Sequence, residues 1–188
     1  MKSFDPDTIY VESTVSSGSQ QPNVLQRYRD SEVMFTAEQA RERGAAILRA
    51  AAYAETEAAV FKTLIGINPK SKGFGEIPKK DLEMAAMMLQ LVRDQREPLP
   101  QGIDCIFGFN TQKPIVVLEW NEVKLQLDLP EARHHALALL AAADAADSDA
   151  FLYQFMTGAT DMELEEVGVL IQQFALYRQR RQLESMIG

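Results

Sequence analysis

Two pairs of acidic residues are the first candidates for metal binding or acid–base chemistry. The pairs are Glu55 with Glu57 and Asp147 with Asp149. Both lie in segments with helical character, where residues two apart point about 200° away from each other. The two carboxylates of one pair therefore cannot ligate the same ion, although one member could meet its counterpart from the other pair. We favour the alternative that both pairs lie on a solvated helix edge.

Four other carboxylates have a spacing that suits a metal site. Asp144 and Asp147 share one helical face, and Glu163 and Glu166 share a face in the next helical segment. This spacing resembles the carboxylate cluster of all-α nucleotide pyrophosphatases, in which Mg²⁺ bridges substrate phosphates. The resemblance implies Mg²⁺-dependent nucleotide hydrolysis. It is limited to the spacing, and a related earlier segment has Ala52 at the place of Asp144.

Two arginines occupy matching places, each one turn inside a predicted helix that follows a strand hairpin. These are Arg41 and Arg133. Our structural interpretation ties each arginine to the acid in the turn of its own half, Asp30 or Glu122. The functional interpretation is that both arginines bind a carboxylate or phosphate of a ligand.

A loop rich in Pro and Gly, at residues 66–78, is a further candidate for partner binding. It contains Lys70, Lys72 and Phe74. The loop is too short for a phosphate-binding motif and follows no βαβ strand. Because loops often carry function, we retain these three residues with Arg41 and Arg133 as partner-binding candidates.

The histidines and the cysteine offer no catalytic group. Adjacent residues of a helix point about 100° apart, so His134 and His135 are not a chelating pair, and we expect both at the surface. Cys105 lies in an apolar strand, where a buried small hydrophobe is the better interpretation than a nucleophile. We assign no catalytic residue and expect a protein that is not an enzyme.

Composition excludes several classes of protein. The chain has 188 residues, a net charge of -8 and one cysteine. One cysteine excludes an internal disulfide framework and a cysteine-based zinc site. The acidic balance argues against a general nucleic-acid binder. No run of about 18 uncharged apolar residues could cross a membrane, and we see no secretory signal, so we expect a cytoplasmic protein.

An internal repeat is the most informative feature of the sequence. Residues 22–64 align without a gap on residues 114–156, an offset of 92 positions. Identities include Pro22 with Pro114 and Val24 with Val116. Residues 1–97 thus form a first copy, with a flexible N-terminal segment and the extra loop at 66–78, and residues 98–188 form a second. We expect one compact domain with pseudo-two-fold symmetry.

Each copy is predicted to be a small antiparallel β-meander followed by two helices, which makes the fold α+β. Short apolar or alternating runs predict strands at 8–15, 24–28, 31–35, 103–109, 114–120 and 123–127. Capping boxes and helical periodicity predict helices at about 36–64, 78–95, 128–156 and 160–185. Thr36 with Gln39, Asp128 with Glu131, and Thr160 with Glu163 are the predicted capping boxes.

Small residues line one face of each long helix at alternating spacings of four and three. The two stripes are Ala40, Gly44, Ile47, Ala51, Ala54, Ala58 and Phe61, and Ala132, Ala136, Leu139, Ala143, Ala146, Ala150 and Tyr153. Small side chains allow close approach of two helix backbones, so we predict an Ala-rich seam between the long helices. The alternative is that each stripe packs on a sheet.

The sequence favours a non-enzymatic accessory, adaptor or assembly protein that binds another protein. An Ala-rich helix after an amphipathic strand is typical of small bacterial and phage proteins. The helix with Met84, Met87 and Met88 offers either an adaptable contact surface or, as we favour, core residues. Self-association and the identity of the partner stay open, and the Mg²⁺-dependent hydrolase is the alternative function.

Overall fold

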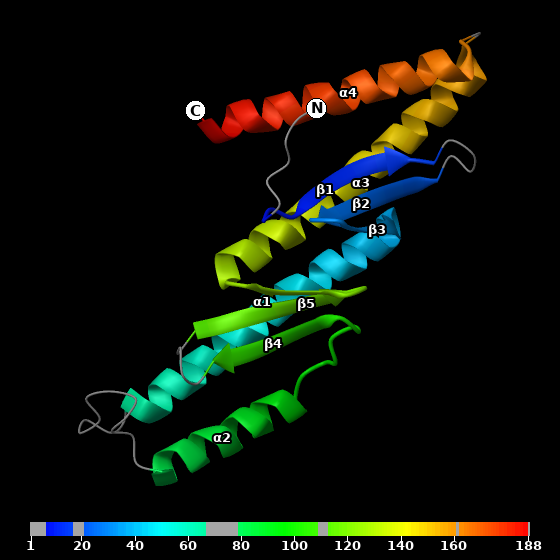
Figure 1. The fold of residues 1–188 in the computed structure, drawn as a ribbon. Coiled ribbons are helices and arrows are strands. Elements are labelled where there is room, and N and C mark those ends of the chain that lie inside the picture. Colours follow the sequence, from blue (N-terminus) through cyan, green and yellow to red (C-terminus); the bar gives the residue numbers. More distant parts are fainter. Residues whose placement is uncertain (1–6, 17–20, 67–78, 109–112, 161, 188) are drawn as a thin grey trace. The chain divides into compact units, whose positions relative to one another are not determined.

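The computed structural model describes residues 7–16, 21–66, 79–108, 113–160 and 162–187, which form an α+β fold. In these residues the strands are β1 (Tyr10–Val15), β2 (Pro22–Tyr28), β3 (Ser31–Thr36), β4 (Ile103–Gly108), β5 (Lys113–Trp120) and β6 (Val123–Leu127). The helices are α1 (Ala37–Gly66), α2 (Lys79–Asp94), α3 (Leu129–Ala159) and α4 (Leu164–Ile187) (Figure 1). The type and order of the predicted elements are confirmed.

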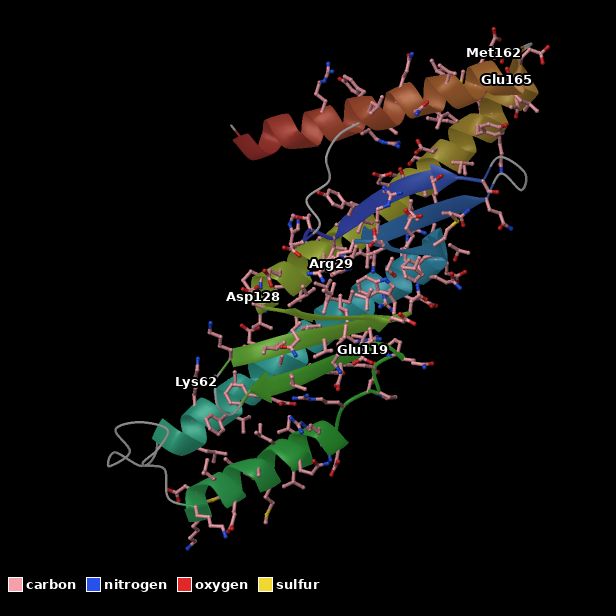
Figure 2. The ribbon with its side chains drawn as sticks, in the orientation of Figure 1. Arg29, Lys62, Glu119, Asp128, Met162 and Glu165 are labelled. Atoms are coloured by element: carbon pink, nitrogen blue, oxygen red, sulfur yellow. The ribbon has the colours of Figure 1, made fainter. Side chains whose placement is uncertain are left out.

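The strands form two antiparallel three-stranded sheets, ordered β1-β2-β3 and β4-β5-β6. Tight two-residue turns join β2 to β3 and β5 to β6. The first residue of each turn has positive φ: Arg29 at 52° and Asn121 at 50°. Positive φ at this position is typical of the turns whose twist matches that of a hairpin. Arg29 lies at the turn shown in Figure 2, and its side chain binds Asp7 at 2.8 Å.

Two of the three predicted capping boxes are confirmed. Thr36 accepts a bond from the Gln39 amide N–H at 3.1 Å, and the Gln39 side chain accepts one from the Thr36 N–H at 3.0 Å. Asp128, labelled in Figure 2, and Glu131 do the same for α3, both at 2.9 Å. These boxes satisfy amide groups that the first turn of a helix leaves without partners.

The third predicted box, Thr160 with Glu163, is wrong. The Thr160 hydroxyl donates instead to the Met156 carbonyl at 2.6 Å, at the end of α3. Glu166 takes the capping role for α4, because its carboxylate accepts the Glu163 N–H at 3.2 Å. The sequence pattern did not reveal that the Thr160 hydroxyl would bond to the last turn of the preceding helix instead of the first turn of α4.

The chain divides into two compact units, and each draws on both predicted copies. Unit 1 comprises residues 1–42 and 138–188, so it combines the β1-β2-β3 sheet with most of α3 and with α4. Unit 2 comprises residues 43–137 and combines most of α1, α2 and the β4-β5-β6 sheet with the start of α3. In each unit the sheet comes from one copy and most helical residues come from the other.

The core of unit 2 joins α1, α2 and β4. Phe61, Leu89 and Phe107 pack there with Ala58 and Ala85. The rings of Phe61 and Phe107 lie 4.8 Å apart between centroids. Burial of a side chain such as Phe61 or Leu89 stabilises the fold by roughly 2–3 kcal/mol, so this cluster holds α2 to the rest of the unit.

The small-residue stripes on α1 and α3 are buried, as their periodicity predicted. Ala54 and Ala146 are fully shielded from solvent, and Ala58 and Ala150 are nearly so. The exception is Tyr153, at the end of the α3 stripe, which is half-buried. None of the helices in the described residues is long and apolar enough to cross a membrane.

Candidate functional site

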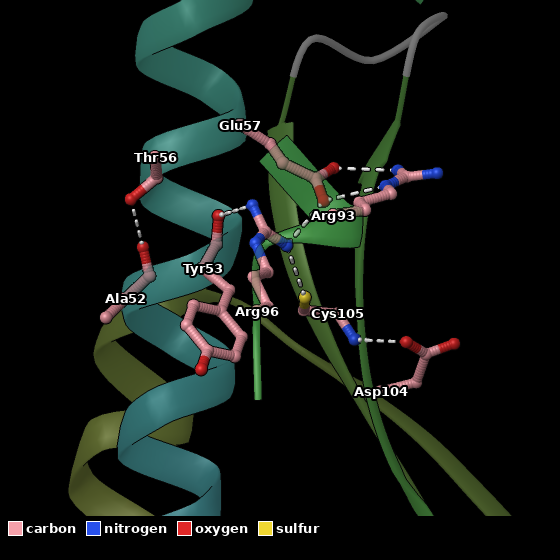
Figure 3. Close-up of polar contacts among 8 residues, drawn as sticks. All are labelled: Ala52, Tyr53, Thr56, Glu57, Arg93, Arg96, Asp104 and Cys105. Carbon is pink, nitrogen blue, oxygen red and sulfur yellow. Dashed lines mark hydrogen bonds and ion pairs between the residues drawn. The ribbon is translucent and has the colours of Figure 1, made fainter. Parts of the chain in front are cut away.

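A buried carboxylate, Glu57, forms the most elaborate polar centre of unit 2 (Figure 3). Arg93 binds it through two nitrogens, with Nε 2.9 Å from Oε1 and Nη2 2.8 Å from Oε2. Arg96 adds a third bond, from Nη1 to Oε1 at 2.7 Å. The hydrogen bonds that Arg93 donates to Glu57 raise the pKa of Arg93. Two guanidinium groups thus neutralise one carboxylate that has no access to water.

Arg96 connects this carboxylate to two further elements. Its Nη2 donates to the Tyr53 carbonyl on α1 at 3.1 Å, and its guanidinium lies 4.7 Å from the centre of the Tyr53 ring. Its Nη1 also lies 3.5 Å from Cys105 Sγ on β4. The fixed donors of a guanidinium suit such a multiple contact, so Arg96 orients α1 against β4 from inside the unit.

Cys105 is buried, as predicted. Burial and the negative charge of Glu57 raise the pKa of its thiol to about 11, against the opposing effect of Arg96. A thiol with this pKa is protonated at neutral pH, whereas a nucleophilic cysteine acts as the thiolate.

Asp149 is the buried carboxylate of unit 1. Arg178 on α4 donates to its Oδ2 at 2.5 Å, and the Ser13 hydroxyl on β1 donates to the same oxygen at 3.4 Å. The prediction that the acidic pairs lie on a solvated helix edge is therefore wrong for Glu57 and Asp149. Arginines distant in sequence compensate their charge, and no local pattern reveals such partners.

The other members of the acidic pairs, Asp147 and Glu55, bind the two candidate arginines. Arg41 donates to Asp144 Oδ1 at 2.8 Å and to Asp147 Oδ2 at 2.5 Å. Arg133 donates to Glu55 Oε2 at 2.5 Å. The prediction that each arginine binds the acid in its own turn is wrong, because carboxylates on the other long helix lie within reach. These arginines are exposed enough for water to screen their ion pairs.

His135 is buried, so its predicted surface position is wrong. Burial, together with the nearby positive charges of Arg43 and His134, lowers the pKa of its imidazole to about 4. Its Nε2 has no hydrogen-bond partner among the described residues. The side chain is therefore neutral at pH 7. His134 is exposed, as predicted.

Three of the four carboxylates of the hydrolase alternative are engaged in other contacts. Asp144 and Asp147 bind Arg41, and Glu166 caps the start of α4. In the parts of the chain that the structure describes, no group of three or more His, Cys, Asp or Glu side chains is placed to hold a metal ion. Lys70, Lys72 and Phe74 lie outside the described residues.

Large apolar side chains on the surface are candidate contact residues that the sequence analysis did not favour. Met84, Met87 and Met88 on α2 are exposed, which contradicts the favoured core interpretation. Phe151 and Phe155 on α3 stack with their ring centroids 6.3 Å apart, and both are exposed. Phe174 and Tyr177 on α4 are exposed too. A count of apolar residues on each helix, compared with the width of one core-facing stripe, would have revealed the excess.

Comparison with known proteins adds no relative to this description. No protein-family model matches the sequence, and searches of curated proteins and of solved structures gave no significant match.

Proposed function

We propose that this chain is a non-enzymatic accessory, adaptor or assembly protein of the cytoplasm that acts through protein–protein contacts. One observation carries the proposal: aromatic side chains on α3 and α4 of unit 1 face solvent. Phe151, Phe155, Phe174 and Tyr177 are between 50% and 67% exposed. We call these four residues the aromatic surface.

The chemistry of the aromatic surface fits protein recognition. Aromatic side chains are enriched among the residues that contribute most binding energy in interfaces, and large exposed apolar groups commonly mark such sites. The chain carries a net charge of -8, and Glu163, Glu165 and Glu166 are exposed at the start of α4. A partner with an apolar centre and a basic rim complements this surface.

The test compares proteins retained from the source cells by the immobilised wild-type chain and by the double variant Phe174→Ser/Tyr177→Ser. Both positions are exposed, so the variant should keep the wild-type melting temperature. We expect a partner that the wild type retains in stoichiometric amount and the variant loses. Equal retention by both proteins would contradict the use of this surface for binding. Met34→Ser, at an exposed position on β3, is the control variant. It removes exposed apolar area outside the aromatic surface.

The alternative function is a Mg²⁺-dependent nucleotide hydrolase using Asp144, Asp147, Glu163 and Glu166. A thermal-shift series with Mg²⁺, Mn²⁺ and nucleotides separates it from the adaptor function. Stabilisation only when metal and nucleotide are both present would favour the hydrolase. Arg41 already neutralises two of the four carboxylates, so we expect no such stabilisation.

We propose further that the two copies, residues 1–97 and 98–188, arose by duplication and are related by a pseudo-two-fold axis. Matching details support this. Positions 29 and 121 both have positive φ, and the two confirmed capping boxes also differ by 92 positions. The buried carboxylates Glu57 and Asp149 are separated by the same offset.

Reciprocal ion pairs support the proposed seam between α1 and α3. Arg41 near the start of α1 binds Asp147 on α3, and Arg133 near the start of α3 binds Glu55 on α1. The two ion pairs correspond under the offset of 92, because Arg41 aligns with Arg133 and Glu55 aligns with Asp147. We propose that the two helices run antiparallel with their alanine stripes in contact.

A further inference from the structure

Helix α2 carries a second apolar face that the core of unit 2 does not use. Ala85 and Leu89 pack into the core with Phe61 and Phe107. Another group of large apolar residues on the same helix is between 44% and 67% exposed. These residues, which we call the methionine face, are Met84, Met87, Met88 and Leu91.

The spacing of the methionine face is that of a helix-pairing surface. At about 100° per residue, its four members fall within an arc of roughly 100°. Positions i, i+3, i+4 and i+7 are those by which one helix packs along another. Methionine side chains are flexible and polarizable, so they adapt to an apolar partner.

Charges beside the methionine face indicate which helix would pack there. Lys80 and Asp94 are exposed and lie on the same flank, Lys80 in the first turn and Asp94 at the last residue of α2. When two identical helices pair antiparallel about a two-fold axis, each flank meets the same flank of its copy. Lys80 then faces Asp94 of the second copy, and the reverse contact forms at the other end.

The same antiparallel register matches the apolar residues. The pairing that brings position 80 opposite position 94 centres the two-fold axis on Met87. Met84 then lies opposite position 90 of the second copy, next to Leu91, and each Met87 meets its own counterpart with Met88 beside it. A parallel pair would instead bring each flank against the opposite flank of the copy and would separate Lys80 from Asp94 by the length of the helix.

We propose that the methionine face of α2 is the contact surface of a homodimer, in which α2 pairs antiparallel with α2 of a second copy of this chain. This surface differs from the aromatic surface of unit 1, so the proposal goes beyond the proposed function and does not depend on it. One helix face is smaller than the roughly 800 Å² per partner of a standard interface, and we expect a dissociation constant in the micromolar range.

Analytical ultracentrifugation of the full chain at concentrations from micromolar to several hundred micromolar tests the proposal. We expect the wild type to change from monomer to dimer with concentration. Met87→Glu places two like charges opposite each other at the axis and should weaken the dimer at least tenfold. Met34→Glu, at an exposed methionine on β3 of unit 1, should leave it unchanged. Circular dichroism verifies that each variant is folded.

A charge exchange tests the register. Lys80→Asp and Asp94→Lys each create like-charge contacts in the antiparallel pair and should weaken the dimer, whereas the double variant restores opposite charges and should recover wild-type association. A wild type that stays monomeric at every concentration overturns the proposal. A dimer that Met87→Glu leaves intact, or that the double exchange fails to restore, overturns it as well.

The same measurements separate this proposal from its competitors. If the wild type is monomeric and Met87→Glu loses a different protein from the cell extract, the methionine face binds a foreign partner and the homodimer is wrong. Loss of a partner in Phe174→Ser/Tyr177→Ser with unchanged dimerisation supports the aromatic surface alone, so the two proposals fail independently.

Discussion

Gln26 is fully buried in β2, yet neither its Nε2 nor its Oε1 has a hydrogen-bond partner in the described part of the chain. Its strand neighbours in register are Val11 and Val33, so the sheet around it is apolar. A buried polar group without a partner costs about 1–3 kcal/mol. The sequence alignment pairs Gln26 with Leu118 in β5 of the other sheet, where the side chain is also fully buried.

We therefore expect Gln26→Leu to stabilise the protein by about 1–3 kcal/mol, because leucine removes the desolvated amide at similar volume. Equilibrium urea unfolding, followed by circular dichroism, measures the change. The reciprocal variant Leu118→Gln should destabilise the protein by a comparable amount. A Gln26→Leu protein less stable than wild type would indicate that the amide has a hydrogen-bond partner, such as ordered water.

His135 is expected to make stability depend on pH above the range in which carboxylates titrate. The folded-state pKa of its imidazole is lowered from 6.5 to about 4 by burial and by nearby positive charge. Between these values the unfolded chain binds a proton that the folded chain excludes, so stability falls as the pH falls. The loss attributable to His135 is about 2 kcal/mol between pH 7 and pH 5.

Urea unfolding at both pH values measures this contribution by comparing the wild type with His135→Gln, which does not titrate. The variant should show a pH dependence smaller by that amount. His134→Gln, at an exposed neighbour, should keep the wild-type pH dependence. Identical dependences in the wild type and in His135→Gln would mean that the pKa of the imidazole is the same in the folded and the unfolded chain.

At the level of elements, the Glu57 centre holds α1, β4 and the residues at the end of α2 together. Glu57→Gln removes the charge that compensates Arg93 and Arg96, while the side chain keeps its shape. Loss of one partner in a buried ion pair costs about 3–5 kcal/mol. We expect about 3 kcal/mol here, because Arg93 is partly exposed and can regain water.

Glu55→Gln is the matched control, two residues away on the same helix. Its ion pair with Arg133 is exposed, so its loss should cost less than about 1 kcal/mol. Urea unfolding of the two variants measures both costs. Equal costs would show that Glu57 is hydrated in solution, or that its arginines find other carboxylates.

The local sequence pattern predicted the helices and strands, but it did not predict the long-range contacts of the buried and exposed carboxylates. Alternation in residues 123–127 and the Thr36 capping box each depend on neighbours a few positions away, and these predictions are confirmed. Arg96 reaches Glu57 across 39 positions, and Arg41 reaches Asp144 across 103. An acidic residue on a helix has the same local sequence pattern whether an arginine approaches it or water does.

At the scale of the whole molecule, each compact unit takes its sheet from one of the two aligned halves of the sequence and most of its helical residues from the other. The proposed duplication would explain this composition, because a domain-swapped dimer has it after fusion of its two chains. Both long helices then contribute to both units. A defect in either helix should therefore affect the whole chain, because no unit is built from one copy alone.

Overpacking of the proposed seam tests this dependence. Ala54 in α1 and Ala146 in α3 are both fully buried and occupy matching places in the two copies. Replacement of either by leucine should cost about 1–3 kcal/mol, because helices separated by small side chains cannot accommodate three added carbon atoms without moving apart. Ala59→Leu and Ala141→Leu, at exposed positions of the same helices, should be nearly neutral.

Urea unfolding of the four variants distinguishes the possible uses of the two stripes. Equal losses for Ala54→Leu and Ala146→Leu are expected when the stripes face each other across a symmetric seam, since each leucine enters an equivalent environment. If both variants unfold at the wild-type urea concentration, the seam does not exist. A large loss for one and none for the other would mean that the stripes pack against unlike surfaces, and the pseudo-two-fold relation would then be wrong even though the aligned sequences share an origin.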